Sequence, residues 1–91
     1  MTVEIIGRQM SGGNEFQHIV AVCWVQASTG ERGRSTRDAM VEYIKGGDSA
    51  FVRNGTNDSV SVGVFELNGV KYLRTYADRQ WNNNLLALPL C

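Results

Sequence analysis

Apolar residues recur at a period of two along much of this chain, which is typical of β-strands. Residues 3–10 alternate in this way and predict a first strand, which ends at a glycine-rich turn over residues 11–14. Residues 15–27 form a longer, β-branched stretch that is largely apolar on both faces. Because a strand buried on both faces has this pattern, we expect the second strand to lie centrally in the sheet.

One segment departs from the two-residue period and predicts a helix over residues 36–45. Its apolar positions share one helical face, and they are Ala39, Met40, Tyr43 and Ile44. Ser35 comes just before this segment, and we expect it to cap the helix by accepting a hydrogen bond from the amide of Asp38. Gly46 and Gly47 follow the last turn, where a helix commonly ends.

The second half of the chain predicts a short strand at residues 50–54 and then a β-hairpin. Two alternating stretches flank Asn68 and Gly69, the strongest two-residue hairpin signal that a sequence offers. This turn fixes the strand register, in which Glu66 faces Lys71 as a favourable cross-strand pair. One face of the hairpin then collects large or charged side chains, namely Phe65, Tyr72, Arg74 and Tyr76.

The printed sequence finishes on its most apolar stretch, which contains Leu85, Leu86, Leu88 and Leu90. One helix cannot cover both faces of a sheet, so we expect this tail or another copy of the protein to cover the second face. Complete burial of a leucine stabilises a fold by roughly 1.5–3 kcal/mol. We therefore predict an α+β fold, with one helix packed on a mainly antiparallel four- to five-stranded sheet and a docked apolar C-terminal tail.

Composition places residues 1–91 in a single small globular domain. Hydrophobic residues make up 43% and charged residues 20% of the chain, close to globular averages. Nine basic and nine acidic residues balance, which argues against a protein that coats nucleic acid. No stretch has the ~18 apolar residues of a membrane helix, and the first residues lack signal-peptide order, so we expect a cytoplasmic protein with no membrane partner.

The chain offers little that indicates catalysis or metal binding. His18 is the only histidine, and on a continuous strand it would face away from Cys23, so the two would not form a base–nucleophile pair. Neither Cys23 nor Cys91 has a neighbour at metal-ligand spacing. Two separate thiols are the favoured state of the cysteines, and a Cys23–Cys91 disulfide is the alternative. We expect no enzyme, no catalytic residue, no cofactor and no metal.

The first candidate binding surface is the hairpin face with Tyr72, Arg74 and Tyr76, followed in sequence by Trp81 and Asn83. Aromatic rings stack on planar ligands, arginine pairs with anions, and asparagine amides match the edges of bases. This combination indicates an anionic or nucleotide-type small molecule. The alternative is that the rings belong to the core and that the arginine extends to solvent or pairs with an acidic neighbour.

The second candidate surface contains the glycine-rich turn over residues 11–14 and three arginines close to the expected start of the helix, namely Arg32, Arg34 and Arg37. The positive end of a helix together with arginine side chains favours a phosphate or a carboxylate. The alternative is that these arginines are simply solvated.

Several fragments taken together resemble a known family, and these are SGG followed by FQHIVAVCW, then STRDAMVEYIKGG, KYLRTYAD and NNLLALP. They are similar to an uncharacterised family of small bacterial and phage-borne proteins, catalogued as domain of unknown function 3892. The resemblance covers roughly residues 5–89 and implies no particular activity.

Two functional hypotheses follow. The first is a non-enzymatic binding or protein-interaction module that forms a dimer or larger homo-oligomer, because a small sheet with an apolar face or an open edge gains most from pairing with a second copy. The second is a phage-type anti-defence protein that sequesters a nucleotide-derived signalling molecule without turnover. It is suggested by the phage-borne relatives and by the aromatic and arginine side chains of the hairpin.

Overall fold

A computed structural model describes residues 2–54, 58–77, 80–82 and 84–91 of the chain. Seven strands form one sheet in the order β3-β2-β1-β4-β5-β6-β7. The strands are β1 (Thr2–Met10), β2 (Ile19–Gln26), β3 (Arg32–Thr36), β4 (Ser49–Asn54), β5 (Asp58–Leu67), β6 (Val70–Ala77) and β7 (Gln80–Asn82). The helical segments are α1 (Arg37–Lys45) and two short 3₁₀ helices, η1 (Phe16–His18) and η2 (Asn84–Ala87).

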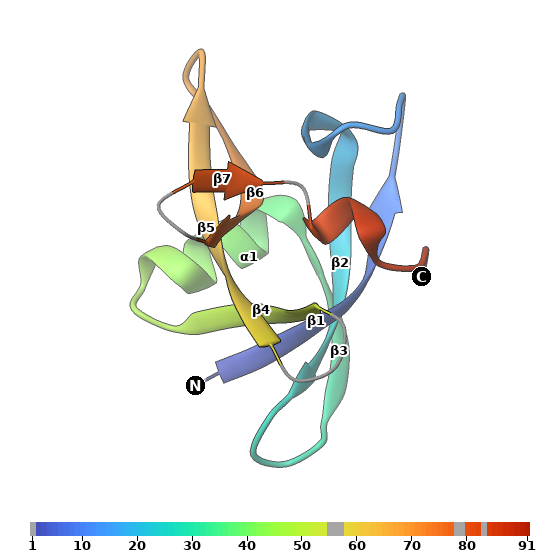
Figure 1. Cartoon of the computed structure of the whole chain (residues 1–91), viewed down its shortest axis with the longest axis vertical. Helices are drawn as coiled ribbons and strands as arrows, with labels where there is room; N and C mark the ends of the chain where they lie inside the picture. The colour runs from blue at the N-terminus through green and yellow to red at the C-terminus, as the bar shows by residue number, and fades with distance from the viewer. Residues whose placement is uncertain (1, 55–57, 78–79, 83) are drawn as a thin grey trace.

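The sheet curls into a half-barrel around its own core (Figure 1). Its strands pair antiparallel, except that β1 and β4 run parallel to each other. The register of β1 against β2 shifts between Ile5 and Gly7 and again between Gln9 and Met10. Such irregularities bend a strand and increase its twist, and accumulated twist is what curls a sheet of many strands.

The predicted fold class is therefore wrong. The protein is mostly β, with a curled seven-stranded sheet and one short helix, in place of a four- to five-stranded sheet with a packed helix. The prediction missed β3 and β7. Neither has an alternating apolar pattern, since β3 reads RGRST and β7 is only three residues long. Each forms by pairing with a strand that is already in place, β2 for β3 and β6 for β7.

The strand expected over residues 15–27 is wrong at its start. Its first part is η1, and β2 begins only at Ile19. β2 lies second from one end of the sheet, between β3 and β1, and Val20 on it is 41% exposed. Ala21 and Val22, which are consecutive on β2 and therefore point to opposite faces, are 1% and 0% exposed, so both faces are buried there, whereas the sheet face at Val20 is open.

The helix lies close to where it was expected, but its cap differs. The Thr36 hydroxyl accepts a hydrogen bond from the Ala39 amide at 3.2 Å, so Thr36 is the N-cap in place of Ser35. Ser35 instead accepts a hydrogen bond from the Trp24 indole nitrogen at 2.9 Å. The helix residues that enter the core are Met40 and Val41.

The predicted hairpin register is confirmed across β5 and β6, including Glu66 opposite Lys71 and Phe65 opposite Tyr72. Asn68 and Gly69 both have positive φ, 53° and 79°. Such turns match the right-handed twist of the flanking strands, which is why two turn residues suffice to set this register.

The core fills the hollow of the curled sheet and is built from α1, five strands and η2. Its fully or nearly buried apolar members are Val3, Ile5, Ile19, Val22, Met40, Val41, Ala50, Val52, Val60, Val62, Leu73 and Leu85. Of the four C-terminal leucines, Leu85 is 1% exposed, whereas Leu90 is 68% exposed. Leu86 and Leu88 pack against the core from its margin.

The start of η2 is held by Thr75, the one polar residue that is buried as a whole among the described residues. The Thr75 hydroxyl donates to the Asn82 carbonyl at 3.0 Å and accepts from the Asn84 amide at 3.1 Å. The Asn82 side chain accepts from the same Asn84 amide at 3.2 Å. One buried hydroxyl therefore joins β6, β7 and η2.

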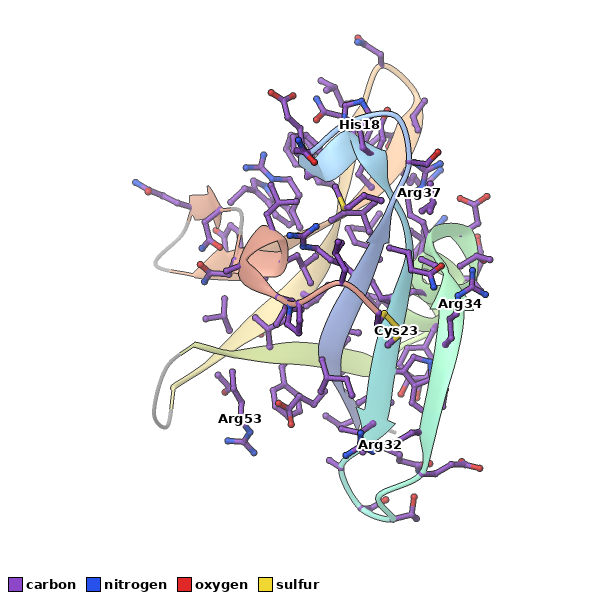
Figure 2. The ribbon with its side chains drawn as sticks, turned by 90° about the vertical axis from the view of Figure 1, so that its right-hand side faces the viewer. His18, Cys23, Arg32, Arg34, Arg37 and Arg53 are labelled. Atoms are coloured by element: carbon purple, nitrogen blue, oxygen red, sulfur yellow. A yellow bond between two sulfur atoms is a disulfide. The ribbon has the colours of Figure 1, made fainter. Side chains whose placement is uncertain are left out.

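A disulfide joins Cys23 to Cys91, so the expectation of two separate thiols is wrong (Figure 2). Cys23 pairs with Gly7 across β1 and β2, and a Cβ atom at Gly7 would lie 2.8 Å from the Cys91 Cβ. Gly7 thus leaves room for the last residue to reach Cys23. Backbone bonds of about 3.0 Å between Arg8 and both Pro89 and Cys91 fasten the tail to β1.

Candidate functional site

An aromatic–arginine cluster covers the outer face of the β5–β6 hairpin and comprises Phe16, Phe65, Tyr72, Arg74, Tyr76 and Trp81. The alternation of β6 and the hairpin register bring Tyr72, Arg74 and Tyr76 onto one face beside Phe65. Phe16 reaches this face from η1, and Trp81 reaches it from β7. Gly63 allows this approach, since a Cβ there would lie 3.1 Å from the Trp81 ring.

Arg74 lies inside this cluster. Its guanidinium carbon is 4.4 Å from the centre of the Phe16 ring and 4.9 Å from the centre of the Phe65 ring. Both distances are within cation–π range. Arg74 therefore links η1 to the hairpin, because its guanidinium contacts one ring from each.

The outer margin of the cluster consists of Tyr76 and Trp81, whose rings meet edge-on with 5.1 Å between their centres. Tyr76 is 42% exposed and Trp81 is 37% exposed. Two aromatic side chains thus form a continuous exposed surface on the last two strands of the sheet. Their position at the sheet edge leaves this surface accessible to another molecule.

Arg37 extends the cluster toward the helix. Its guanidinium carbon lies 5.1 Å from the centre of the Tyr72 ring, and its Nε lies 3.6 Å from an Asp38 carboxylate oxygen. Arg37 also lines a cavity of about 420 Å³ between α1 and the hairpin turn, together with Asp38, Val41, Glu42, Gly69, Val70 and Lys71. This cavity holds charges of both signs, so its charges partly cancel.

Arg34 does not join the other predicted site residues. Its Nε donates to the Gln9 side-chain oxygen at 2.9 Å, and the Gln9 amide nitrogen donates to the Cys91 carbonyl at 3.0 Å. Figure 2 shows Arg34 and Arg37 at separate points along this side of the molecule. Asn83, the remaining predicted site residue, lies outside the described residues.

Phe16 is the member of the cluster that the sequence-based prediction missed. It belongs to η1, which precedes β2, and it contacts Phe65 and Tyr72 with ring centres 5.6 and 5.5 Å apart. The glycine-rich turn before it indicates a reversal of the chain. That signal does not show on which strands the ring comes to rest, so no local pattern identified it.

Candidate metal ligands do not gather within the part of the chain that the structure describes. No three His, Cys, Asp or Glu side chains gather there closely enough to hold a metal ion. The His18 Nδ1 accepts from the Glu15 amide at 3.4 Å, and Cys23 is in the disulfide. The pKa of Tyr43 is raised, first by burial and second by the negative charge of Asp48.

A helix must be long and apolar to cross a membrane. Among the described residues, none of the helices has the length and apolar character needed to cross a bilayer.

Comparison with known proteins identifies a family without an assigned activity. The model for the family described as protein of unknown function (DUF3892) matches residues 4–89. No curated protein and no solved structure matches the chain. The matched residues include the helix, the hairpin, the aromatic–arginine cluster and most of the C-terminal tail. The chain therefore belongs to the family described as protein of unknown function (DUF3892).

Proposed function

We propose that this protein is a non-enzymatic interaction module that self-associates through the β7 edge of its sheet. The observation that carries the proposal is the pair of exposed aromatic side chains, Tyr76 and Trp81, which contact each other beside that edge. Tyrosine and tryptophan are enriched at protein interfaces, where they supply large contact areas at a low entropic cost.

The two edges of the sheet differ in charge, and this difference selects β7. The β3 edge carries exposed Arg32 and Arg34, and charged side chains on an edge strand oppose pairing with another strand. The β7 segment, Gln80–Asn82, contains no charged residue. A second copy would add antiparallel to β7 about a two-fold axis, with Tyr76 and Trp81 of both copies in the interface. The zero net charge of the chain adds no long-range repulsion between copies.

Sedimentation velocity of the wild-type protein and of Trp81→Lys tests this proposal. The wild type should sediment as a dimer, and the variant should sediment as a monomer because a buried lysine opposes the contact. Leu67→Lys is the matched control, since Leu67 is exposed to a similar degree, 39%, but lies at the hairpin turn. Circular dichroism checks that each variant is folded. A monomeric wild type at high concentration, or a dimeric and folded Trp81→Lys, would contradict the proposal.

Capture of an anionic, nucleotide-type signalling molecule, as expected of a phage-type anti-defence protein, is the second candidate. The observation that favours it is the cavity of about 420 Å³, where Arg37 and Lys71 supply positive charge and the Tyr72 ring lies against Arg37. Asp38 and Glu42 line the same cavity, so a bound phosphate would need to lie on the Arg37 and Lys71 side.

Isothermal titration with a panel of cyclic mono- and dinucleotides separates this candidate from self-association. Binding that Arg37→Gln and Lys71→Gln each weaken, and that Arg32→Gln on the far edge leaves unchanged, would support it. Absence of heat with every member of the panel would remove it.

The cytoplasmic location expected from the sequence stays a prediction, and the Cys23–Cys91 disulfide weighs against it. Disulfides persist mainly in oxidising compartments and are rare in the cytosol. Alkylation of free thiols in intact cells, followed by mass spectrometry, would show in which state these cysteines occur.

A further inference from the structure

The edge of the sheet opposite β7 is formed by β3, and its backbone is oriented to pair with a further strand. β3 has β2 on one side, and no other described strand lies on its outer side. The Gln26 amide donates to the Glu31 carbonyl at 2.7 Å, and hydrogen-bonded pairs alternate along an antiparallel ladder. The register of β2 against β3 therefore turns the backbone N–H and C=O groups of Arg32 and Arg34 away from β2.

The same two residues carry the charge of this edge. Arg32 and Arg34 are exposed and follow each other along β3 (Figure 2). Because they are two residues apart on a strand, they project from one face of the sheet, spaced by about 7 Å. Glu31 precedes them and alternates to the other face. Asp38 lies beyond the end of β3, where its carboxylate is 3.6 Å from the Arg37 Nε.

These arginines oppose pairing between two copies but favour pairing with an acidic strand. Two copies joined here about a two-fold axis would place arginines against arginines, and like charges opposite each other destabilise a strand pair. A strand with carboxylates at alternate positions would place one opposite each arginine, which stabilises the pair. The Arg34 Nε already donates to the Gln9 side chain at 2.9 Å, so this guanidinium loses less freedom when a partner binds.

The outward backbone groups also discriminate between kinds of acidic partner. A nucleic-acid backbone presents phosphate oxygens, which are acceptors only, so it would leave the outward carbonyls of Arg32 and Arg34 without donors. A peptide strand supplies one donor and one acceptor at each pairing residue. Addition of a peptide strand to an open sheet edge is also a recurring mode of recognition.

We propose that the β3 edge binds an extended acidic segment of another protein, which adds antiparallel to β3 with carboxylates opposite Arg32 and Arg34. The backbone groups require an extended peptide, and the spacing of the two arginines requires acidic residues at alternate positions. This edge lies at the other end of the sheet from β7, so failure of either proposal leaves the other standing.

Titration of the full-length protein with a capped heptapeptide, threonine throughout except for glutamate at its third and fifth positions, tests the proposal in NMR spectra. The peptide should bind saturably with a dissociation constant of roughly millimolar order, the value for about four main-chain hydrogen bonds. The amide protons of Arg32 and Arg34 should move downfield, because each gains a hydrogen bond. The same peptide N-methylated at both glutamates keeps its charge but lacks the facing donors, and it should not bind. No saturable shift with the first peptide, or equal binding of the N-methylated one, would overturn the proposal.

An exchange of charges tests the role of the two arginines. The double variant Arg32→Glu with Arg34→Glu should bind the glutamate peptide at least about tenfold more weakly, and it should bind the corresponding lysine peptide, which the wild type should not bind. Lys45→Glu is the matched control, because Lys45 is an exposed cation at the end of α1 and should change neither affinity. Circular dichroism checks that each variant is folded. A folded double variant that still prefers the glutamate peptide would overturn the proposal.

Oligothymidylate tests the choice of a peptide over a nucleic acid. It should cause no saturable shift at the amides of Arg32 and Arg34 in the wild type. Binding of oligothymidylate that is tighter than binding of the glutamate peptide, and that the double variant loses, would assign the edge to nucleic acid and overturn the proposal.

Discussion

The surroundings of Arg74 show that the contacts of a single side chain can depend on distant parts of the chain. The period-two pattern of β6 was enough to predict that Tyr72, Arg74 and Tyr76 share a face. It was not enough to predict that Phe16 would lie over Arg74, because η1 is brought there by the packing of a different part of the sheet. The bond from Arg34 to Gln9 likewise joins segments that no local pattern brings together.

At the residue scale, the Tyr43 hydroxyl gives a prediction for alkaline pH. Its pKa in the folded protein is raised above the ordinary 10.0, chiefly by burial and then by Asp48. As the pH rises, the unfolded chain therefore loses this proton first, and the folded state loses stability from about pH 10 upward, through the folded pKa. Urea unfolding should show that the free energy of unfolding of the wild type minus that of Tyr43→Phe is constant from pH 7 to 9 and falls above pH 10.

Tyr76→Phe serves as the control, because it retains Tyr43 and should keep the wild-type decline. A difference between wild type and Tyr43→Phe that stays constant up to pH 11 would contradict the assigned cause.

Two leucines in the C-terminal tail form a matched pair for a stability measurement. Leu85→Ala should lower the free energy of unfolding by about 2–5 kcal/mol, since it leaves a cavity in the core. Leu90→Ala should change it by less than about 0.5 kcal/mol, because Leu90 is 68% exposed. Urea denaturation followed by tryptophan fluorescence measures both values. Equal losses for the two variants would mean that the tail is packed differently.

At the scale of elements, the hairpin and the short strands behave differently. The turn geometry depends on Asn68 and Gly69 themselves, because both adopt positive φ. The register of β5 and β6 could therefore be predicted residue by residue. The β3 segment carries no such signal, because its arginines, glycine and hydroxyl residues have weak strand preference. Its strand conformation depends on pairing with β2.

The hairpin turn gives the prediction at this scale. Gly69→Ala should destabilise the protein by about 1–2 kcal/mol, since alanine resists the φ of 79° that this position has. Asn68→Gly is the matched variant and should cost little, because glycine accepts positive φ as readily as asparagine does. Thermal unfolding of both variants measures the effect. A loss in Asn68→Gly that equals the loss in Gly69→Ala would contradict this account of the turn.

For the whole molecule, the curl of the sheet and the disulfide are the features that a one-dimensional pattern did not show. Cys23 and Cys91 are 68 positions apart in sequence, yet their Cα atoms lie 6.5 Å apart. The curl brings the tail back across β1, where Gly7 leaves room for the sulfur bridge. A chain of this length buries a modest core, so a covalent link across the fold contributes a large share of its stability.

Removal of the disulfide tests that share. Replacing both cysteines, Cys23→Ser with Cys91→Ser, should lower the free energy of unfolding by roughly 4 kcal/mol, the chain-entropy value for a loop of this length. Reduction of the wild type with dithiothreitol should give a similar loss in urea denaturation. A double variant as stable as the oxidised wild type would show that the tail is held by its noncovalent contacts alone.

The amino-acid pattern alone determined the position of β1, the extent of α1 to within a residue, and the register of the β5–β6 hairpin, because each depends on interactions between near neighbours in the chain. Only the tertiary structure decided the strand number, the curl, the Cys23–Cys91 bond, and the surroundings of Arg74, Trp24 and Tyr43. Those features depend on contacts between segments far apart in sequence, and no local period or propensity encodes which segments meet.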